Sequence, residues 1–159
     1  MKNAINHYPY SIQRAGFAEL SVSQFYALAK LRQDVFIIEQ QSIYSDLDGL
    51  DSDAIHFLCW STKALAPQLL AYARYRFCVA GKEVKIERVV CRDVARGKGL
   101  GKQLMLEILQ DIKTQHTGIK ISLSAQVEAQ AFYQALGFIA HGERYDDGGI
   151  EHITMYYGS

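Results

Sequence analysis

Apolar residues near the N-terminal end of the chain recur at intervals of three and four, which is the spacing of one helix face. The pattern runs from Ser23 to Glu39, and Ser21 or Ser23 can cap its N-terminus. Its apolar positions are Phe25, Leu28, Leu31, Val35 and Ile38. The sequence therefore predicts an amphipathic helix here, followed by a loop rich in Asp and Ser over residues 40–53.

Short apolar runs, several of them alternating with polar residues, predict strands along the rest of the chain. Residues 11–19 can hold a first strand, and Gly81 predicts a hairpin between two of the later ones. Those later strands are expected at residues 54–61, 69–77, 84–92, 119–124, 138–141 and 150–157. The glycines near residue 148 predict a turn over residues 145–149 before the final strand.

Two more helices are predicted in the second half of the chain. One covers residues 99–115, and the other runs from Val127 to Leu136 and stops at Gly137. The apolar face of the first consists of Leu100, Leu104, Met105, Ile108, Leu109 and Ile112. The element order predicts a single α+β domain over residues 1–159, an α/β/α three-layer fold in which helices cover both faces of a mixed, mostly antiparallel central sheet.

The composition of the chain is ordinary for a globular protein. Apolar residues make up 49% and charged residues 21% of the 159 residues. The sequence contains no apolar run of the ~18 residues that a membrane span needs, and no apolar signal-peptide region precedes Tyr8. Cys59, Cys78 and Cys91 lie in apolar runs, which predicts buried free thiols in a reducing, cytoplasmic compartment; a disulfide or a nucleophilic thiol is the alternative.

Charge is balanced over the whole chain but not along it. The formal net charge is zero, which argues against general nucleic-acid binding. Residues 34–53 carry six acidic side chains and neither Lys nor Arg, whereas residues 82–102 carry seven basic and three acidic ones. The first segment suits a cation, or is a solvated acidic loop, and the second suits an anion.

The basic segment contains a glycine-rich turn between the strand at 84–92 and the helix at 99–115. The turn reads Arg96-Gly97-Lys98-Gly99-Leu100-Gly101-Lys102. Unpaired N–H groups and the macrodipole make a helix start electropositive, and glycines let an anion approach the backbone and tolerate positive φ. The turn is therefore a candidate site for a phosphate or pyrophosphate, with an ordinary exposed turn as the alternative.

Other phosphate and metal motifs do not fit the spacing. A Walker A loop needs one more residue between its glycines, and a Ser or Thr at the position of Gln103. A dinucleotide fingerprint needs Gly-x-Gly-x-x-Gly, whereas the glycines here alternate. The acidic residues at 46–57 lack the EF-hand ligand pattern, and no His or Cys spacing indicates zinc, so we expect no metal.

The pattern that remains, Arg-x-x-Gly-x-Gly at residues 96–101 after a strand, resembles motif A of the GNAT superfamily of N-acetyltransferases. Residues 126–138, which end in Phe-Tyr-x-x-x-Gly-Phe, resemble motif B of the same superfamily. The stretches that look like its ElaA branch are residues 31–41, 44–51, 123–126 and 145–152. The resemblance therefore extends over most of the chain, from about Leu28 to Met155.

This resemblance implies a GNAT-like fold in which acetyl-CoA is the co-substrate and a primary amine attacks its thioester directly. The glycine-rich turn would hold the diphosphate, the backbone near residues 89–91 would stabilise the developing oxyanion, and the start of motif B would contact the cofactor arm. The implied donor-binding residues are Val89, Val90, Cys91, Arg96, Gly97, Lys98, Gly99, Leu100, Gly101, Lys102, Gln126 and Ala129.

The resemblance also implies catalytic roles. Tyr133 matches the general-acid tyrosine of motif B by position. The candidates for the general base are Glu39, His56, Glu87 and His152, each with a structural hydrogen-bonding role as the alternative. The candidates for binding the amine are Glu39, Asp48 and His56.

We expect the acceptor to be a small-molecule or peptide amine, and neither nucleic acid nor a membrane to be a partner. The oligomeric state stays open between a monomer and a homodimer. Two other function classes also stay open: an acyl-CoA-binding regulator without turnover, and a phosphate-binding module of a different fold.

Overall fold

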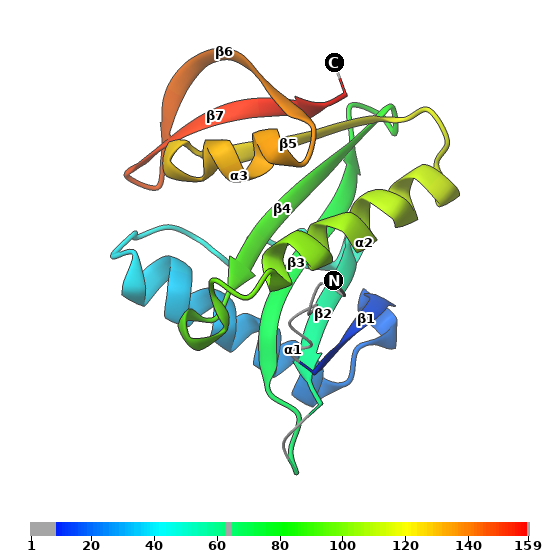
Figure 1. Ribbon diagram of the computed structural model, residues 1–159, viewed down its shortest axis with the longest axis vertical. Helices are drawn as coiled ribbons and strands as arrows, with labels where there is room; N and C mark the ends of the chain where they lie inside the picture. Colours follow the sequence, from blue (N-terminus) through cyan, green and yellow to red (C-terminus); the bar gives the residue numbers. More distant parts are fainter. Residues whose placement is uncertain (1–8, 63–64, 159) are drawn as a thin grey trace, which may run out of the picture.

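Seven strands form one sheet in the computed structural model, which describes residues 9–62 and 65–158 (Figure 1). The strands are β1 (Tyr10–Gly16), β2 (Ile55–Ser61), β3 (Leu69–Cys78), β4 (Glu83–Cys91), β5 (Lys120–Gln126), β6 (Phe138–Asp147) and β7 (Ile150–Tyr157). Their spatial order is β1-β2-β3-β4-β5-β7-β6, and every neighbouring pair is antiparallel except β4 and β5. The predicted mixed, mostly antiparallel sheet is confirmed.

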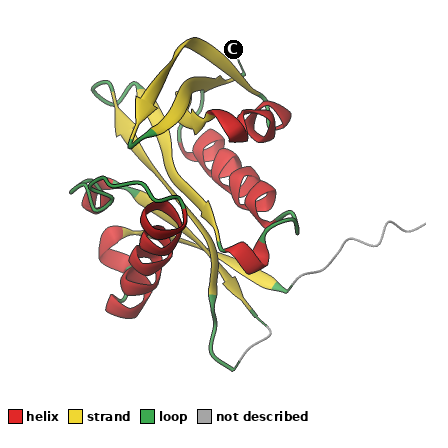
Figure 2. Ribbon diagram, turned by 90° about the vertical axis from the view of Figure 1, so that its left-hand side faces the viewer, coloured by secondary structure: helices red, strands yellow, loops and turns green. Residues whose placement is uncertain are grey.

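Helices cover both faces of the sheet (Figure 2). They are α1 (Val22–Arg32), its π-helical continuation η2 (Gln33–Glu39), α2 (Leu100–Gln115) and α3 (Gln130–Ala135). Short 3₁₀ segments are η1 (Phe17–Glu19), η3 (Asp51–Asp53), η4 (Asp93–Ala95) and η5 (Val127–Ala129). Because α1 lies on one face and α2 and α3 lie on the other, the three-layer arrangement is also confirmed.

Each helical layer packs on its own apolar core. Beneath α2 the predicted apolar face is buried in full, with Leu100, Leu104, Met105, Ile108, Leu109 and Ile112. Beneath α1 a smaller core includes Leu28, Leu31 and Tyr72. At about 1.5–3 kcal/mol for each fully buried aliphatic side chain, the α2 face is worth on the order of 10 kcal/mol. The start of α2 is therefore firmly anchored to the sheet.

A β-bulge bends β4 at Arg88. Tyr72 and Arg74 of β3 are two residues apart, but their partners in β4, Val90 and Glu87, are three residues apart. The strand β4 therefore carries one extra residue between these pairs. Arg88 adopts φ 58°, in the left-handed region that is costly for a residue with a Cβ. On its other side, the pairing of β4 with β5 ends at Ile86. The two parallel strands therefore part beyond this point and leave an opening in the sheet.

The helix predicted over residues 23–39 is present but changes pitch. Ser21 caps α1 through reciprocal hydrogen bonds with Gln24, and the helix begins at Val22. After Arg32 the segment continues as η2, which ends with the amide of Gln40 bonded to a carbonyl five residues back. Such π-helical segments occur frequently at functional sites, and this one faces the opening between β4 and β5.

Three predicted boundaries are corrected by the structure. The first strand ends at Gly16, and residues 17–19 form η1. The predicted turn at 145–149 shrinks to Gly148 and Gly149, because β6 continues to Asp147 as a hairpin with β7. The helix predicted over residues 127–136 begins as η5, and only its last part, α3, is α-helical.

Two findings bear on compartment and membrane association. None of the helices within residues 9–62 and 65–158 is both long and apolar enough to cross a membrane. All three cysteines are free thiols, as predicted; Cys59 is buried, whereas Cys78 and Cys91 are half-buried.

Candidate active site

A cleft of about 580 Å³ opens where β4 and β5 part. Its walls come from η2 and the loop after it, the end of β3, most of β4, the end of β5, η5 with α3, and the β6–β7 hairpin. The predicted site residues that line it are Glu39, Asp48, Glu87, Val89, Val90, Cys91, Arg96, Gln126, Ala129, Tyr133 and His152. Residues that are far apart in the chain are thus brought together in one place.

The glycine-rich turn, residues 96–102, leads from the cleft at Arg96 into the first turn of α2. Gly97 has φ 74° and Gly99, the N-cap of α2, has φ 76°, so both need the left-handed conformation that glycine adopts most easily. Gly101 departs from the prediction, because it lies in the helix without positive φ. An added Cβ there would lie 3.6 Å from the Phe132 ring, an ordinary contact distance. Two of the three glycines therefore shape the turn.

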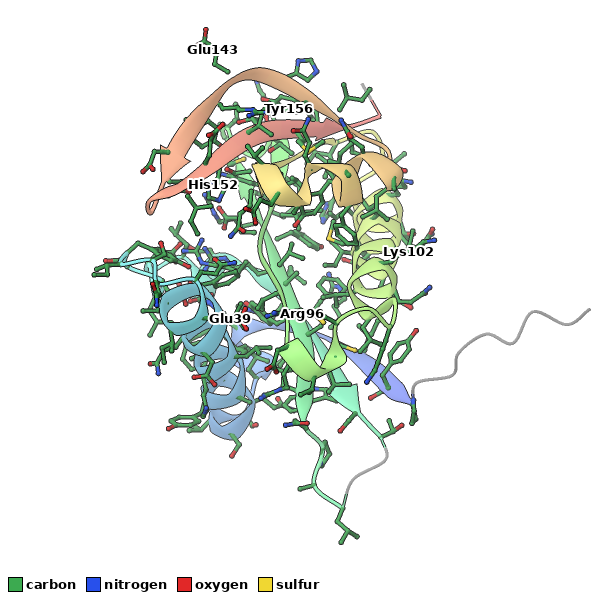
Figure 3. The ribbon with its side chains drawn as sticks, turned by 60° about the vertical axis from the view of Figure 1, so that its left-hand side comes forward. Glu39, Arg96, Lys102, Glu143, His152 and Tyr156 are labelled. Atoms are coloured by element: carbon green, nitrogen blue, oxygen red, sulfur yellow. The ribbon has the colours of Figure 1, made fainter. Side chains whose placement is uncertain are left out.

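Backbone N–H groups of the first turn of α2 have no partners within the helix, which makes this end of the cleft suitable for an anion. Two basic side chains of the turn, Arg96 and Lys98, are engaged within the protein. Arg96 Nη2 donates to Glu39 Oε2 at 2.7 Å, and Lys98 Nζ donates to the Val94 carbonyl at 3.0 Å. Figure 3 shows Glu39 and Arg96 on neighbouring elements, with Lys102 farther along on α2.

Residues 39–42, called the strap below, connect the glycine-rich turn with the β6–β7 hairpin. Besides the ion pair of Glu39, Gln40 and Gln126 exchange two amide hydrogen bonds, at 3.0 and 3.3 Å. The Ser42 hydroxyl donates to the carbonyl of Gly148. Gln126, the predicted contact to the cofactor arm, is therefore bonded to the strap in this structure.

Tyr133 lies on α3 with 8% of its surface exposed, at the edge of the cleft. Its ring makes edge contacts with Phe132 and Phe138, with centroids 5.0 and 6.1 Å away. Burial raises the pKa of the phenol above its ordinary value near 10. The hydroxyl therefore stays protonated at neutral pH and is available as a proton donor.

Glu87, one of the predicted bases, faces the cleft but is held by arginines. Arg76 donates to both of its oxygens, at 2.9 and 3.0 Å, and Arg74 donates to Oε2 at 2.9 Å. Burial alone would raise its pKa, but the hydrogen bonds and charges of the two arginines outweigh this effect and lower it. A carboxylate stabilised in this way is a weak base, and its oxygens are already occupied.

The other predicted catalytic base, His152 of β7, lines the cleft and has one ring nitrogen fixed. Nδ1 lies 2.7 Å from the carbonyl oxygen of Ile150. Because a carbonyl can only accept, the neutral ring carries its proton on Nδ1, and Nε2 keeps its lone pair. The ring is stacked on Tyr145, with centroids 6.2 Å apart and planes at 21°. This geometry suits a positioned base.

His56 does not belong to the cleft, which corrects its prediction as a substrate-binding residue. It is fully buried between the sheet and η3. Nε2 lies 2.8 Å from the Asp51 carbonyl, and Nδ1 lies 2.6 Å from the Tyr72 hydroxyl, so both ring nitrogens are engaged. Burial lowers the pKa of His56, which favours the neutral ring. Its role is structural.

Three of the six acidic residues in the acidic stretch 34–53, Asp46, Asp48 and Asp51, are neutralised by arginines and are therefore not free to bind a cation. Arg32 bonds Asp46 and Asp51 at 2.9 and 2.7 Å, and Arg74 bonds Asp51 and Asp48 at 2.7 and 2.6 Å. The buried charge network, as we call it, consists of Arg32, Arg74, Arg76, Arg88, Asp46, Asp48, Asp51 and Glu87. The positive and negative charges of these eight residues balance.

Asp48 lines the cleft wall, but its carboxylate oxygens already accept hydrogen bonds from within the protein. Its oxygens accept hydrogen bonds from Arg74, from Arg88 and from the backbone amide of Leu50. Burial opposes ionisation of Asp48, but these bonds, led by those of Arg74, lower its pKa. Asp48, predicted to bind the amine, therefore lies at the cleft, but its carboxylate is paired with arginines of the protein.

The sequence analysis missed the four arginines of this network, although two signals were present. Arg32 follows Leu28 by four positions and lies on the apolar face of α1, where an unpaired charge would be costly. Arg74 stands among the apolar positions of β3 and is fully buried. A charged residue within an otherwise apolar pattern indicates a buried partner of opposite charge, and the acidic stretch supplies those partners.

Comparisons with known proteins identify the family. Residues 32–158 match the family described as Acetyltransferase (GNAT) domain. Protein ElaA of Escherichia coli (strain K12) is 41% identical over 141 residues, which cover 87% of this chain and 90% of ElaA. The chain therefore belongs to the GNAT acetyltransferase family, and the predicted relationship to its ElaA branch is confirmed.

Solved structures agree with this assignment. The crystal structures of E. coli ElaA and of an acyl-CoA N-acyltransferase from Pseudomonas aeruginosa each match with a TM-score of 0.84 and 38% identity, over 93% of this chain and 99% of theirs. A Bacillus subtilis acetyltransferase in complex with CoA shares the fold alone, with a TM-score of 0.66 and 16% identity over 93% of this chain and 97% of that one.

Proposed function

We propose that this protein is an N-acetyltransferase that moves an acetyl group from acetyl-CoA to a primary amine by direct attack on the thioester. Membership of a family of acyl-CoA N-acyltransferases supports the reaction class. The observation that carries the proposal is the cleft between the parted strands, which adjoins an anion-binding turn and has Tyr133 and His152 in its walls.

The residues around the cleft fit the donor. The positive-φ glycines and the amides at the start of α2 suit a diphosphate, with Arg96, Lys98 and Lys102 adding charge. The β4 edge from Val89 to Cys91 lies beyond the pairing with β5 and offers backbone N–H groups to a developing oxyanion. Gln126 and Ala129 stand at the cleft wall for contacts with the cofactor arm.

The chemistry needs a neutral amine, and an amine with a pKa near ~10.4 is mostly protonated at pH 7. In the proposed step the amine nitrogen attacks the thioester carbonyl, the carbon–sulfur bond breaks, and the sulfur leaves as a thiolate. His152 Nε2 takes the proton that the amine must lose, and the Tyr133 hydroxyl gives a proton to the thiolate. Solvent then restores both groups.

His152 is the strongest of the four predicted bases by its surroundings. Glu87 is occupied by two arginines, Glu39 is paired with Arg96 beside the glycine-rich turn, and His56 is buried away from the cleft. His152 alone among these candidates combines a position in the cleft wall with a ring nitrogen whose lone pair is set free by the bond of the other nitrogen.

The first test measures CoA thiol release with a panel of amines, and donor binding by thermal shift. Acetyl-CoA and CoA should stabilise the protein more than ATP or inorganic phosphate does. Tyr133→Phe should keep the affinity for acetyl-CoA and lower turnover, since only the proton donor is lost. Unchanged turnover would remove this role for Tyr133.

The second test addresses the base. His152→Gln should lower kcat by about 10²-fold or more, the usual contribution of a positioned base. His141→Gln is a matched control, because the His141 ring also contacts a tyrosine ring of the same hairpin, here edge-on, but does not line the cleft. Equal rates in the two variants would exclude His152 as the base.

The same experiments discriminate between the proposal and its alternatives. A regulator without turnover would bind CoA tightly but release no thiol with any amine. A phosphate-binding module would be stabilised as much by inorganic phosphate as by acetyl-CoA.

A further inference from the structure

Two basic side chains face each other directly across the strands at the far end of the cleft. Arg76 of β3 and Lys85 of β4 are register partners, and both line the cleft. Like charges directly opposite each other in a sheet are destabilising. Such a pair persists at a cost in folding free energy unless an anion lies between the two charges.

Within the protein, Glu87 pairs closely with only one of the two basic side chains. Glu87 bonds Arg76 through both oxygens, but the Lys85 Nζ is 4.0 Å from Glu87 Oε1, at the outer limit of an ion pair. Glu87 also forms an ion pair with Arg74. Since the buried charge network is already neutral, Lys85 adds one positive charge to it, and with 36% of its side chain exposed it carries that charge into the cleft.

The wall of the cleft that the β6–β7 hairpin forms carries a carboxylate and neither Lys nor Arg. His152 lies on this hairpin, and Asp147 lines the wall at the end of β6. A molecule with an amine and an anionic group is therefore oriented by the field of the cleft, with the amine toward His152 and the anion toward Lys85.

From this arrangement we infer that the acceptor is a small primary amine that also carries a carboxylate, which is bound by Lys85 and Arg76. This inference rests on the proposed acetyltransferase function. A carboxylate between a lysine and an arginine makes charge-assisted hydrogen bonds, and it reduces the repulsion between the two like charges. Lys85 and Arg76 are thus residues that determine acceptor specificity.

The sheet register sets the spacing between the two ends of this acceptor. Lys85 lies opposite Ser122 of β5, whereas His152 lies opposite Gln126 of the same strand. Four residues of strand separate these two levels, or about 13 Å at ~3.3 Å per residue. Side chains that lean toward each other shorten this distance, but it stays longer than the separation of amine and carboxylate in an α-amino acid. The carboxylate is therefore several bonds away from the amine.

Matched probes test the inference by binding as well as by turnover. With CoA at saturation, calorimetry should show 6-aminohexanoate binding at least tenfold more tightly than its uncharged analogue 6-aminohexanamide, and more tightly than glycine. In the thiol-release assay the acid should likewise have a KM at least tenfold lower than the amide. An acid and an amide that bind equally would overturn the inference, whether or not either is acetylated.

Variants assign the effect to the residue. Lys85→Gln should raise the Kd and KM of the acid about tenfold, leave those of the amide within twofold, and leave kcat and CoA affinity unchanged. Lys85→Arg should restore binding of the acid. Lys82→Gln, in the exposed β3–β4 turn outside the cleft, is the control for a nonspecific change of charge. If Lys85→Gln weakened the acid and the amide equally, Lys85 would have no role in carboxylate recognition.

The two proposals fail in distinguishable ways. Selective binding of the acid without thiol release would contradict the proposed function and support the carboxylate site. Thiol release with no preference for the acid would support the proposed function and contradict the carboxylate site.

Discussion

The glycine-rich turn and the buried charge network lie at two sides of one cleft and are built in opposite ways. The turn is seven consecutive residues, 96–102, whose backbone conformation is set locally by Gly97 and Gly99. The network takes its members from α1, the loop that follows η2, η3, β3 and β4, and none of its ion pairs joins neighbours in the chain. A local turn can be recognised from its residues, whereas the network exists only once the sheet and α1 have assembled.

The difference also concerns energy. Charges in the turn stay near solvent, so changing them alters binding more than stability. Charges in the network are buried, so removing one partner leaves the others unpaired in a medium of low dielectric constant. Substitutions at the two places should therefore separate stability from donor binding. The four predictions below, in order of expected size, concern residues of these two places or residues bonded to them.

The largest effect is expected from Arg74→Met. It leaves Asp48, Asp51 and Glu87 without their shared partner, which should lower the free energy of unfolding by about 3–5 kcal/mol. Urea unfolding followed by circular dichroism measures this loss. Arg74→Lys, which keeps the charge but not the forked donor geometry, should lose less. A loss below ~1 kcal/mol for Arg74→Met would mean that the network does not contribute to folding as a unit.

A smaller effect on stability, but a clear one on binding, is expected from Gly99→Ala. An alanine at φ 76° costs about 1–2 kcal/mol, and the strain would shift the amides at the start of α2. The Kd for CoA, measured by calorimetry, should rise about tenfold, the equivalent of ~1.4 kcal/mol. Gly101→Ala is the control, because that position has no positive φ and room for a methyl group. Similar behaviour of the two variants would contradict the distinction between these glycines.

Stability should depend on pH through His56. Its folded pKa is lowered, mainly by burial, so the unfolded chain binds a proton more readily. The stabilisation is present above the ordinary histidine pKa near 6.5 and is lost as the pH falls from there through the folded pKa. Urea unfolding of the wild type at pH 8 and pH 5.5 should show this decrease, and His56→Gln should show a smaller one. A decrease of the same size in the variant would assign the effect to other groups.

The smallest effect is expected from Glu39→Gln. Both members of its ion pair with Arg96 are nearly half exposed, so stability should change by less than ~1 kcal/mol. Removal of the carboxylate frees Arg96 for the diphosphate, and CoA should bind a few-fold more tightly at low salt, with the gain diminishing as salt is added. Weaker binding of CoA would show that Glu39 instead orients Arg96 for the donor.

The sequence was sufficient for the parts of this protein that local patterns determine. The periodicity of Leu100 to Ile112 predicted α2 and its buried face, and the glycines predicted the turn that precedes the helix. The sequence was insufficient for side-chain contacts that depend on the pairing between strands. His56 is bonded to Asp51 and Tyr72, and Asp48 is bonded to Arg74, so the polar atoms of both predicted residues are engaged within the protein. The register of β2, β3 and β4 brings these neighbours together.

Because β4 gains a residue at Arg88, its side chains exchange sides halfway along the strand. Val84 and Ile86 are buried beneath α2 before the bulge, whereas Val90, also an even-numbered position, is buried beneath α1 after it. Strict alternation of the same residues without a bulge would direct Val90 toward α2 and Cys91 toward α1, into the wrong layers. The bulge and the extra residue therefore belong together, and a relative that keeps both layers but lacks the bulge should also be one residue shorter in this strand.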